Sequence, residues 1–344
     1  MASAPPAAAT WRSLDAAARE REYSPSSAIG GDYQPFIQAY AERSAAARRA
    51  TPGMLNLRYG GSDAQCLDLF IPSPPDTGHA AQLPPLLLLI HGGYWQELSK
   101  NESSFGATQC VNQGIAFAAL DYPLAPQATL AQIVASCRAA LAWLHANAAT
   151  LGFDAQRIIV AGSSAGAQLA AMTALAHDNA LPGVSARAGA ACVRAVVLVS
   201  GIYELEPLLG TSINTALGLT QRTARALSPA LHELKGFPPA IVCWGEVETA
   251  EFKRQSRDFA ARLAKAGSTC TVFEVAQRNH FDIILDLADP ATTLGRAVAK
   301  LIRSTSVTSS VSSSATGPAT SSATNSATSS ATSSATTNER EREA

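Results

Sequence analysis

Residues 157–166, Arg-Ile-Ile-Val-Ala-Gly-Ser-Ser-Ala-Gly, constrain the fold of this chain more than any other segment. An apolar run typical of a buried strand meets the pattern Gly162-x-Ser164-x-Gly166, and the helix-forming run Ala-Gln-Leu-Ala-Ala-Met follows directly. A strand, a tight turn and a helix in this order are typical of a nucleophile elbow, whose strained turn exposes the serine hydroxyl. A side chain at position 162 or 166 would collide with the neighbouring strand or helix, which explains the glycines. We therefore expect Ser164 to be a nucleophile.

Continuously apolar runs separated by helix-length segments define the rest of the expected fold. Such runs are typical of parallel strands buried on both faces, and the helix-length segments include residues 130–149 and 251–266. Residues 55–59 and 66–72 predict an antiparallel pair joined by a Gly-Gly-Ser-Asp turn. The expected class is α/β, with a doubly wound, mostly parallel sheet. Its buried strands are expected at residues 86–90, 115–120, 158–160, 195–199, 240–244 and 270–275.

The chain is expected to form one domain between residues 11 and 303. Its 47% hydrophobic content is enough for a large core, and no Pro/Gly/Ser-rich linker divides this stretch. Residues 11–50 are charged and predict an N-terminal helical cap segment over the domain. We expect residues 1–10 to be a disordered N-terminus. Residues 304–344 form a Ser/Thr/Ala tract with almost no apolar bulk, so a disordered tail is expected there.

The charge distribution predicts a small-molecule partner rather than a polyanion. The formal net charge is -1 and the basic residues are scattered along the chain. Neither nucleic acid nor an anionic membrane surface is therefore an expected partner. The sequence leaves open whether two copies form a homodimer.

Cysteine usage and the N-terminal residues predict a cytoplasmic protein. The six cysteines occur singly, which favours buried reduced thiols over a disulfide framework or a zinc site. Residues 1–10 lack the basic region and long apolar core of a secretory signal, and no stretch approaches the length of a membrane span. Neither metal-ligand spacing nor a Gly-rich phosphate loop occurs, so no metal and no cofactor are expected.

The segment His91-Gly92-Gly93-Tyr94-Trp95 follows the strand expected at residues 86–90. Acyl transfer passes through a tetrahedral oxyanion, which needs preorganised N–H donors worth about 3 kcal/mol each. Glycines let the backbone approach the substrate oxygen closely. We expect the amides of Gly93 and Tyr94 to be donors, with Gly92 shaping the turn, together with the amide of Ala165 directly after the nucleophile.

A general base is expected just past the last strand, because catalytic residues of a doubly wound sheet lie beyond the carboxyl ends of its strands. His280 occupies that position, and an imidazole can take the serine proton at neutral pH. His91 is expected to brace its loop through a backbone hydrogen bond. The other histidines fall in predicted loops or on helix faces and are expected to be structural: His79, His145, His177 and His232.

The acidic partner of the base is expected after residues 240–244, where three glutamates follow Gly245. An acid two or three residues past the strand can turn back toward the imidazole, so Glu248 is the first choice and Glu246 the second. Glu251 fits the first turn of the next helix, where the helix dipole favours a carboxylate. Nucleophile, acid and histidine then occur in the order typical of α/β-hydrolases. The acid would hold one tautomer of the imidazole.

Four motifs resemble the α/β-hydrolase kynurenine formamidases (arylformamidases), relatives of the hormone-sensitive-lipase-like esterases. His91-Gly92-Gly93-Tyr94-Trp95 resembles the HGGYW of that family, and Glu22-Tyr23-Ser24-Pro25-Ser26 is similar to its E-x-YSPS segment. Residues 251–256, Glu-Phe-Lys-Arg-Gln-Ser, resemble its EF-x-RQS, and residues 280–284, His-Phe-Asp-Ile-Ile, its HFDII. The resemblance runs from about residue 12 to about residue 303.

The resemblance implies hydrolysis of N-formyl-L-kynurenine to formate and L-kynurenine through a formyl-enzyme. It assigns the nucleophile to Ser164, the acid to Glu248 and the base to His280; the family more often has Asp at the acid position, so Glu248 adds one methylene. Tyr94 and Trp95 could stack on the substrate ring. A carboxylesterase for short acyl esters is the alternative enzyme, and a non-catalytic binding module on a hydrolase scaffold is the alternative of another class.

Overall fold

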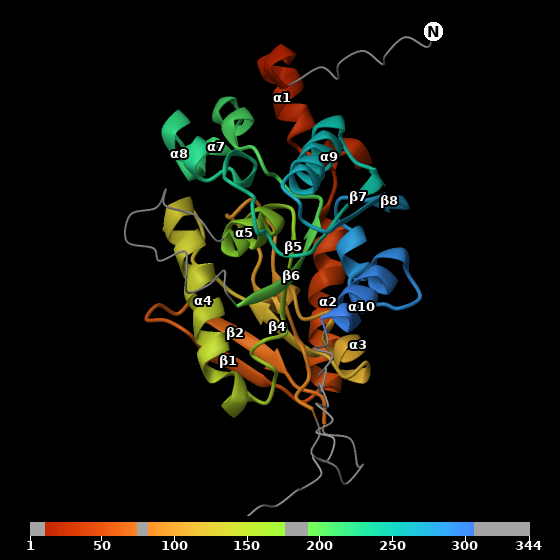
Figure 1. Cartoon of the computed structure of the whole chain (residues 1–344). Helices are drawn as coiled ribbons and strands as arrows, with labels where there is room; N and C mark the ends of the chain where they lie inside the picture. Colours follow the sequence, from red (N-terminus) through yellow and green to blue (C-terminus); the bar gives the residue numbers. More distant parts are fainter. Residues whose placement is uncertain (1–10, 74–81, 176–191, 306–344) are drawn as a thin grey trace, which may run out of the picture. The chain divides into compact units, whose positions relative to one another are not determined.

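The computed structural model describes residues 11–73, 82–175 and 192–305. In these residues eight strands form one sheet in the order β1-β2-β4-β3-β5-β6-β7-β8 (Figure 1). Strands β4, β3, β5, β6, β7 and β8 run parallel to one another, whereas β2 pairs antiparallel with both β1 and β4. The strands are β1 Met54–Arg58, β2 Cys66–Phe70, β3 Leu86–Ile90, β4 Ala116–Leu120, β5 Ile158–Ser163, β6 Val193–Val199, β7 Ala240–Val247 and β8 Cys270–Asn279. The predicted sheet and its leading antiparallel pair are confirmed.

Helices cover both faces of this sheet, so the fold is doubly wound (Figure 1). One apolar cluster joins a sheet face to α4 (Leu130–Leu151), α5 (Ala165–Ala174) and α9 (Ala250–Lys265). The other joins the opposite face to α2 (Gln34–Ala50), α3 (Ala107–Asn112) and α10 (Thr293–Ser304). The short helices α7 (Asn214–Leu217) and α8 (Gln221–Ala226) lie between β6 and β7 in the chain.

The last strand differs from the expectation that every apolar run is buried on both faces. Every residue of β3 and β4 is buried. In β8, by contrast, only Val275 is buried, and Val272 is 44% exposed. Strand β8 is the edge of the sheet, so it has a strand neighbour on one side alone. The expectation was wrong here because a short apolar run does not reveal whether its strand is central or at an edge.

The N-terminal segment, residues 11–50, is helical as predicted. It contains α1 (Ala16–Glu22), the one-turn helices Trp11–Ser13 and Pro25–Ile29, and α2. Tyr23 anchors the segment: its ring is 1% exposed, and its hydroxyl donates to Glu251 Oε2 at 2.7 Å and accepts from Gln255 Nε2 at 3.0 Å. Two polar side chains on α9 therefore hold the N-terminal segment in place, although Tyr23 lies more than 220 residues before them in the chain.

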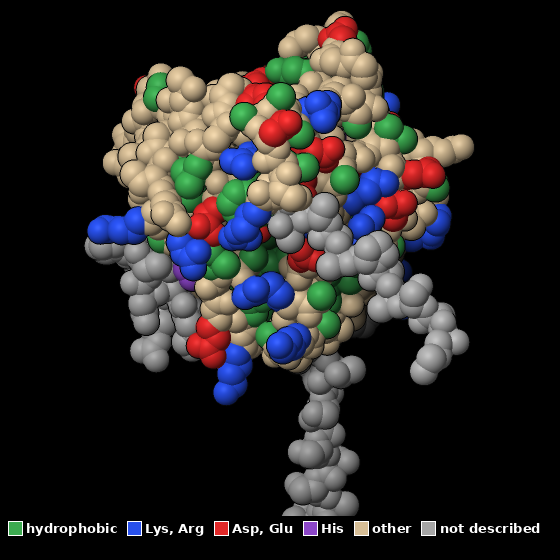
Figure 2. Space-filling model, turned by 90° about the horizontal axis from the view of Figure 1, so that it is seen from above, with side chains coloured by type: hydrophobic (Ala, Val, Ile, Leu, Met, Phe, Trp, Pro, Cys, Tyr) green, Lys and Arg blue, Asp and Glu red, His purple; other side chains and the backbone are tan. Residues whose placement is uncertain are grey.

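Further sequence expectations concern the cysteines, membrane spans, surface charge and the chain ends. Four cysteines are buried free thiols, Cys66, Cys110, Cys137 and Cys243, while Cys192 and Cys270 are partly exposed. No helix of residues 11–73, 82–175 or 192–305 combines the length and apolarity of a bilayer span. On the face shown in Figure 2, basic and acidic side chains of the described residues are interspersed. The tail was expected to be disordered from residue 304, but Ser304 is the last residue of α10 and Thr305 follows as its C-cap. The disorder expected for residues 1–10 and for residues 306–344 falls outside the described residues.

Candidate active site

The nucleophile elbow has the geometry that its sequence predicts. Ser164 lies between the end of β5 and the start of α5, with φ 58° and ψ −123°. This region of backbone space is costly for a residue with a side chain, so the surrounding structure must hold it. A Cβ atom at Gly162 would overlap the backbone of Gly166, and one at Gly166 would overlap the carbonyl oxygen of Ile90 on β3. Glycine is therefore required at position 162 for β5 and α5 to approach so closely, and at position 166 for α5 to approach β3.

The imidazole of His280 and the carboxylate of Glu248 form a hydrogen-bonded pair. His280 Nδ1 donates to Glu248 Oε2 at 3.0 Å, and the two side chains are 5% and 1% exposed. Glu248 directly follows β7 and His280 directly follows β8, so adjacent strand ends bring them together. With Nδ1 carrying the proton, Nε2 of the neutral ring is an acceptor. The pair thus has the arrangement that general-base chemistry requires.

The structure separates the three glutamates that the sequence left open. Glu246 is exposed, and its carboxylate accepts the backbone N–H of Gln277 at 2.8 Å. Glu251 lies in the first turn of α9, as expected, and binds Tyr23 and Arg254. The carboxylate that meets the imidazole is therefore that of Glu248.

Ser200 also belongs to the site, beside Glu248, and the sequence reasoning missed it. Its hydroxyl donates to Glu248 Oε1 at 2.6 Å, and the backbone N–H of Gly245 donates to the same oxygen, also at 2.6 Å. Ser200 is fully buried and has φ 50°. It follows β6 directly, so its place just past an apolar run was a usable signal. Glu248 is thus fixed at both oxygens, one by His280 and one by Ser200 and Gly245.

The glycine loop after β3 lies against the elbow. A Cβ atom at Gly92 would lie 3.2 Å from Ser164 Cβ, and Gly93 has φ 88°. Gly92, Gly93 and Tyr94 line the same cavity as Ser164 and His280. Ala165 is the first residue of α5, so its N–H has no acceptor within that helix. The amide-bearing residues expected to form an oxyanion site therefore surround the serine.

His91 braces this loop, as the sequence predicts. Its Nδ1 lies 2.9 Å from the carbonyl oxygen of Gly92, which can only accept, and its ring stacks on Tyr122 with centroids 4.2 Å apart. The hydroxyl of Tyr122 donates to the carbonyl oxygen of His91 at 2.9 Å. Burial lowers the pKa of His91 to about 4, so the ring is neutral near pH 7.

The two aromatic residues of the loop have different surroundings. Tyr94 lines the cavity, and its hydroxyl donates to the carbonyl oxygen of Tyr23. Trp95 is 0% exposed in the core, where its Nε1 donates to Gln168 Oε1 at 3.1 Å. The expected contact between Trp95 and a substrate is therefore wrong, because the tight turn directs this indole inward, against α5.

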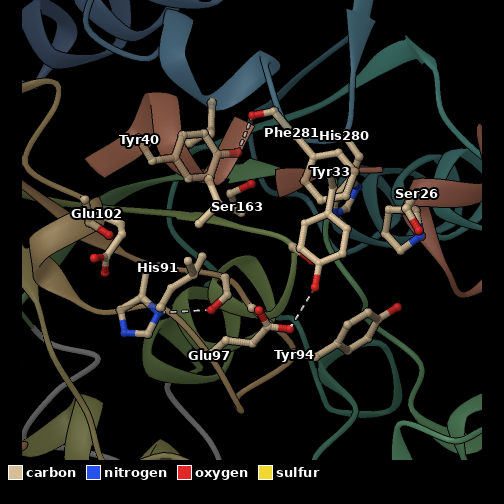
Figure 3. Close-up of a pocket in the computed structure, with 18 of the residues that line it drawn as sticks. Ser26, Tyr33, Tyr40, His91, Tyr94, Glu97, Glu102, Ser163, His280 and Phe281 are labelled. Carbon is tan, nitrogen blue, oxygen red and sulfur yellow. Dashed lines mark hydrogen bonds between the residues drawn. The ribbon is translucent and has the colours of Figure 1, made fainter. Parts of the chain in front are cut away.

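The cavity has a volume of about 230 Å³, and the N-terminal segment supplies one of its walls (Figure 3). Tyr33 stacks on Phe281, the residue after His280, with centroids 5.3 Å apart. The hydroxyl of Tyr40 donates to the carbonyl oxygen of Phe281. The sequence predicted a helical cap segment here but did not identify these tyrosines as part of the site.

The remaining histidines that the structure describes lie elsewhere. His145 is on α4, and His232 Nε2 lies 2.8 Å from the carbonyl oxygen of Ala226. His79 and His177 fall outside the described residues. Within residues 11–73, 82–175 and 192–305, no group of three or more His, Cys, Asp or Glu side chains is arranged to hold a metal ion.

Comparison with known proteins places this geometry in a family. The BD-FAE family model matches residues 67–263, more than half of the chain. Kynurenine formamidase from Danio rerio is 31% identical over 304 residues, which cover 85% of this chain and 98% of that protein. The chain belongs to the kynurenine formamidase family. It is a hydrolase of the α/β-hydrolase fold.

Other relatives of this family member include both formamidases and esterases. Kynurenine formamidase from Drosophila melanogaster is 32% identical over 241 residues, 68% of this chain and 76% of that protein. Esterase LipQ from Mycobacterium tuberculosis is 29% identical over 309 residues, 80% of this chain and 70% of that protein. Among solved structures, a candidate thioesterase from Silicibacter sp. TM1040 has a TM-score of 0.67 and 27% identity, covering 81% of this chain and 98% of that one.

Proposed function

We propose that this member of the kynurenine formamidase family hydrolyses N-formyl-L-kynurenine to formate and L-kynurenine, with Ser164 as the nucleophile. The observation that carries the proposal is the buried Glu248–His280 pair beside a cavity that His280 shares with Ser164 and the glycine loop. The 31% identity to a kynurenine formamidase over nearly the whole length of that protein supports the substrate.

In the first step His280 Nε2 takes the proton of Ser164 Oγ, and Oγ bonds to the formyl carbon. The carbonyl π electrons move to oxygen, and the amides of Gly93, Tyr94 and Ala165 donate to the resulting oxyanion. Glu248 keeps the proton of His280 on Nδ1 and stabilises the imidazolium that forms. Because Ser200 and Gly245 hold the other carboxylate oxygen, Glu248 needs little reorganisation during this step.

In the second step the C–N bond breaks, and the imidazolium gives its proton to the departing arylamine. A formyl ester of Ser164 remains. His280 then takes a proton from water, whose oxygen attacks the ester, and collapse of the intermediate returns that proton to Ser164 and releases formate. An arylamine leaves more readily than an alkylamine, so a site of the esterase type is sufficient for this amide.

The chemistry of the cavity wall suits an aromatic substrate. Tyr33, Tyr94 and Phe281 line it, and aromatic rings bind other rings by stacking and edge contacts. These residues come from three separate segments of the chain, so the wall forms only when the chain is folded. A small aromatic molecule is therefore the proposed partner.

A carboxylesterase for short acyl esters is the second candidate function, because Esterase LipQ is 29% identical over 309 residues. The same acyl-enzyme chemistry would cleave such esters. The ratio of kcat/KM for N-formylkynurenine to kcat/KM for p-nitrophenyl acetate distinguishes the two functions: a ratio well above one supports the formamidase, and a ratio well below one supports the esterase.

Replacing Ser164 by Ala tests the proposal directly. We expect kcat to fall by about 10⁵- to 10⁶-fold, because the acyl-enzyme can no longer form, while circular dichroism and the melting temperature stay close to those of the parent protein. A fluorophosphonate probe should label the parent and not the variant. Retained turnover by purified S164A would refute the assignment, and failure of the parent to react with the probe would favour a non-catalytic binding module.

We also propose that the protein works in the cytoplasm. The free thiols Cys66, Cys110, Cys137, Cys243 and Cys270, the last of them partly exposed, suit a reducing compartment. Measuring activity after incubation with oxidised glutathione tests this proposal. Activity that is unchanged by this treatment would remove its support.

A further inference from the structure

The cavity that contains Ser164 has an unusual balance of charge at its walls. Among the described residues, its lining includes three carboxylates, those of Glu20, Glu97 and Glu102, and neither Lys nor Arg. N-formylkynurenine carries an ammonium and a carboxylate on the chain next to its aryl ring. The described lining therefore offers carboxylates that can pair with the ammonium, and no Lys or Arg that could pair with the carboxylate.

Glu97 is the carboxylate with the longest, and so the weakest, existing hydrogen bond. Glu20 accepts hydrogen bonds from the N–H and the hydroxyl of Ser212, and Glu102 accepts one from Ser99 Oγ at 2.7 Å. The carboxylate of Glu97 accepts one long bond, from the hydroxyl of Tyr33 at 3.4 Å, and forms no ion pair with the part of the chain that the structure describes. It is exposed, so it can exchange water for a ligand at small desolvation cost.

Tyr33 links Glu97 to the catalytic side of the cavity. The ring of Tyr33 stacks on Phe281, and its hydroxyl points toward Glu97, which follows the glycine loop in the chain (Figure 3). Burial, followed by the charge of Glu97, raises the pKa of Tyr33, so its hydroxyl stays protonated and keeps donating. One aromatic face and one carboxylate thus lie together at the wall, and both attract a cation.

We propose that Glu97 is a specificity-determining residue that binds a cationic group on the leaving arylamine, so that the site selects formanilides bearing an ammonium group and does not require a carboxylate. The inference rests on the proposed function and names the substrate class of the same site. It extends the substrate range to the decarboxylated amine, whose ammonium meets Glu97 without an accompanying anion that the acidic wall would repel.

A matched series of substrates tests this inference. Four formanilides share one aryl ring and differ in the ortho chain, which carries an ammonium alone, an ammonium and a carboxylate, no charge, or a carboxylate alone. We expect kcat/KM to fall in that order, by roughly fivefold between the first and the neutral compound, which is the size of a partly exposed charge pair. Added salt should compress the differences.

Two variants of Glu97 and one control assign the effect. Glu97→Gln should lower kcat/KM for the two ammonium compounds by roughly fivefold and leave the neutral one unchanged. Glu97→Lys should reverse the order and make the carboxylate compound the better substrate. Glu42→Gln removes the same charge from an exposed residue of α2 that does not line the cavity, and it should leave the order intact. An unchanged order in Glu97→Lys would overturn the inference.

The corresponding formate esters, with the same four ortho chains, separate this inference from the proposed function. If the anilides are inert and the esters are cleaved in the predicted charge order, the formamidase proposal fails and the role of Glu97 stands. If the anilides are cleaved at rates that do not depend on the charge of the ortho chain, the formamidase proposal stands and the role of Glu97 fails. Turnover of neither series would refute both.

Discussion

The two halves of the candidate site are built in different ways. On the nucleophile side, Gly162, Gly166 and the loop after β3 set the backbone so that Ser164 and residues 92–94 line the same cavity. On the other side, the side chains of Glu248, His280 and Ser200 meet through hydrogen bonds between three strand ends. Steric exclusion fixes the first half, and a short polar network fixes the second. Substitutions should therefore act differently on the two.

After Ser164→Ala, the largest expected effect is in the side-chain half. Glu248→Gln keeps the shape of the acid but removes its charge, so it weakens both the tautomer preference of His280 and the stabilisation of the imidazolium. We expect kcat to fall by about 10³- to 10⁴-fold, as for the loss of a triad carboxylate elsewhere. Steady-state kinetics on N-formylkynurenine measure it.

Glu246→Gln is the matched control for that substitution. It makes the same chemical change two residues away, at an exposed carboxylate that binds the N–H of Gln277. We expect its kcat to stay within about twofold of the parent, because an exposed charge with no contact to the imidazole contributes little. Equal losses in the two variants would mean that the Glu248–His280 contact does not decide activity.

Sequence reasoning reached the two halves to different depths. The nucleophile half lies in two continuous segments whose glycines are needed locally, so residues 91–95 and 162–166 could be interpreted from the sequence. The other half depends on contacts between separate strand ends. His280 and Glu248 were found by their places after strands. Ser200 has the same signal, because it follows β6, but a serine there carries no motif that sets it apart from an ordinary loop residue.

The misses beyond the catalytic residues have the same cause. Trp95 was expected in the cavity because it belongs to the segment of the glycine loop. In a tight turn, however, neighbouring side chains can point to opposite sides, and this indole is buried against α5. Tyr33 and Tyr40 come from a segment more than 120 residues before the nucleophile. The helix that contains Tyr40 and directly follows Tyr33 was predictable, whereas its docking beside Phe281 depends on tertiary packing.

The backbone half should respond to pH through His91. The pKa of this ring is lowered to about 4 by burial, against about 6.5 in an unfolded chain, so the unfolded state binds more protons between these values. Stability is then fully present above about pH 6.5 and is lost as the pH falls toward 4. The contribution of this group is about 3 kcal/mol.

Urea unfolding at pH 7.0, 6.0, 5.0 and 4.5 tests this contribution. His91→Asn cannot acquire a charge, so its unfolding free energy should fall less steeply with decreasing pH than that of the parent. His145→Asn, a change on the surface helix α4, should reproduce the parent slope. If the parent and His91→Asn lose the same free energy over this range, His91 is not the group that couples loop stability to pH.

The smallest of these effects separates the positioning of Glu248 from simple burial. Ser200→Ala removes one of the two hydrogen bonds to Glu248 Oε1 and leaves the bond from Gly245 in place. We expect kcat to fall about tenfold, which corresponds to roughly 1.4 kcal/mol and to the loss of one charge-assisted hydrogen bond. KM should change little, because Ser200 does not line the cavity.

Ser44 offers a matched control for this last substitution. It is also a fully buried serine, on α2, and its hydroxyl has no hydrogen-bond partner among the described residues. Ser44→Ala removes the same atom without breaking a bond, so kcat should be unchanged and stability equal or higher. If Ser200→Ala loses stability but keeps the kcat of the parent, Ser200 is a packing residue. If kcat falls while the melting temperature holds, the polar network of this half positions the acid for catalysis.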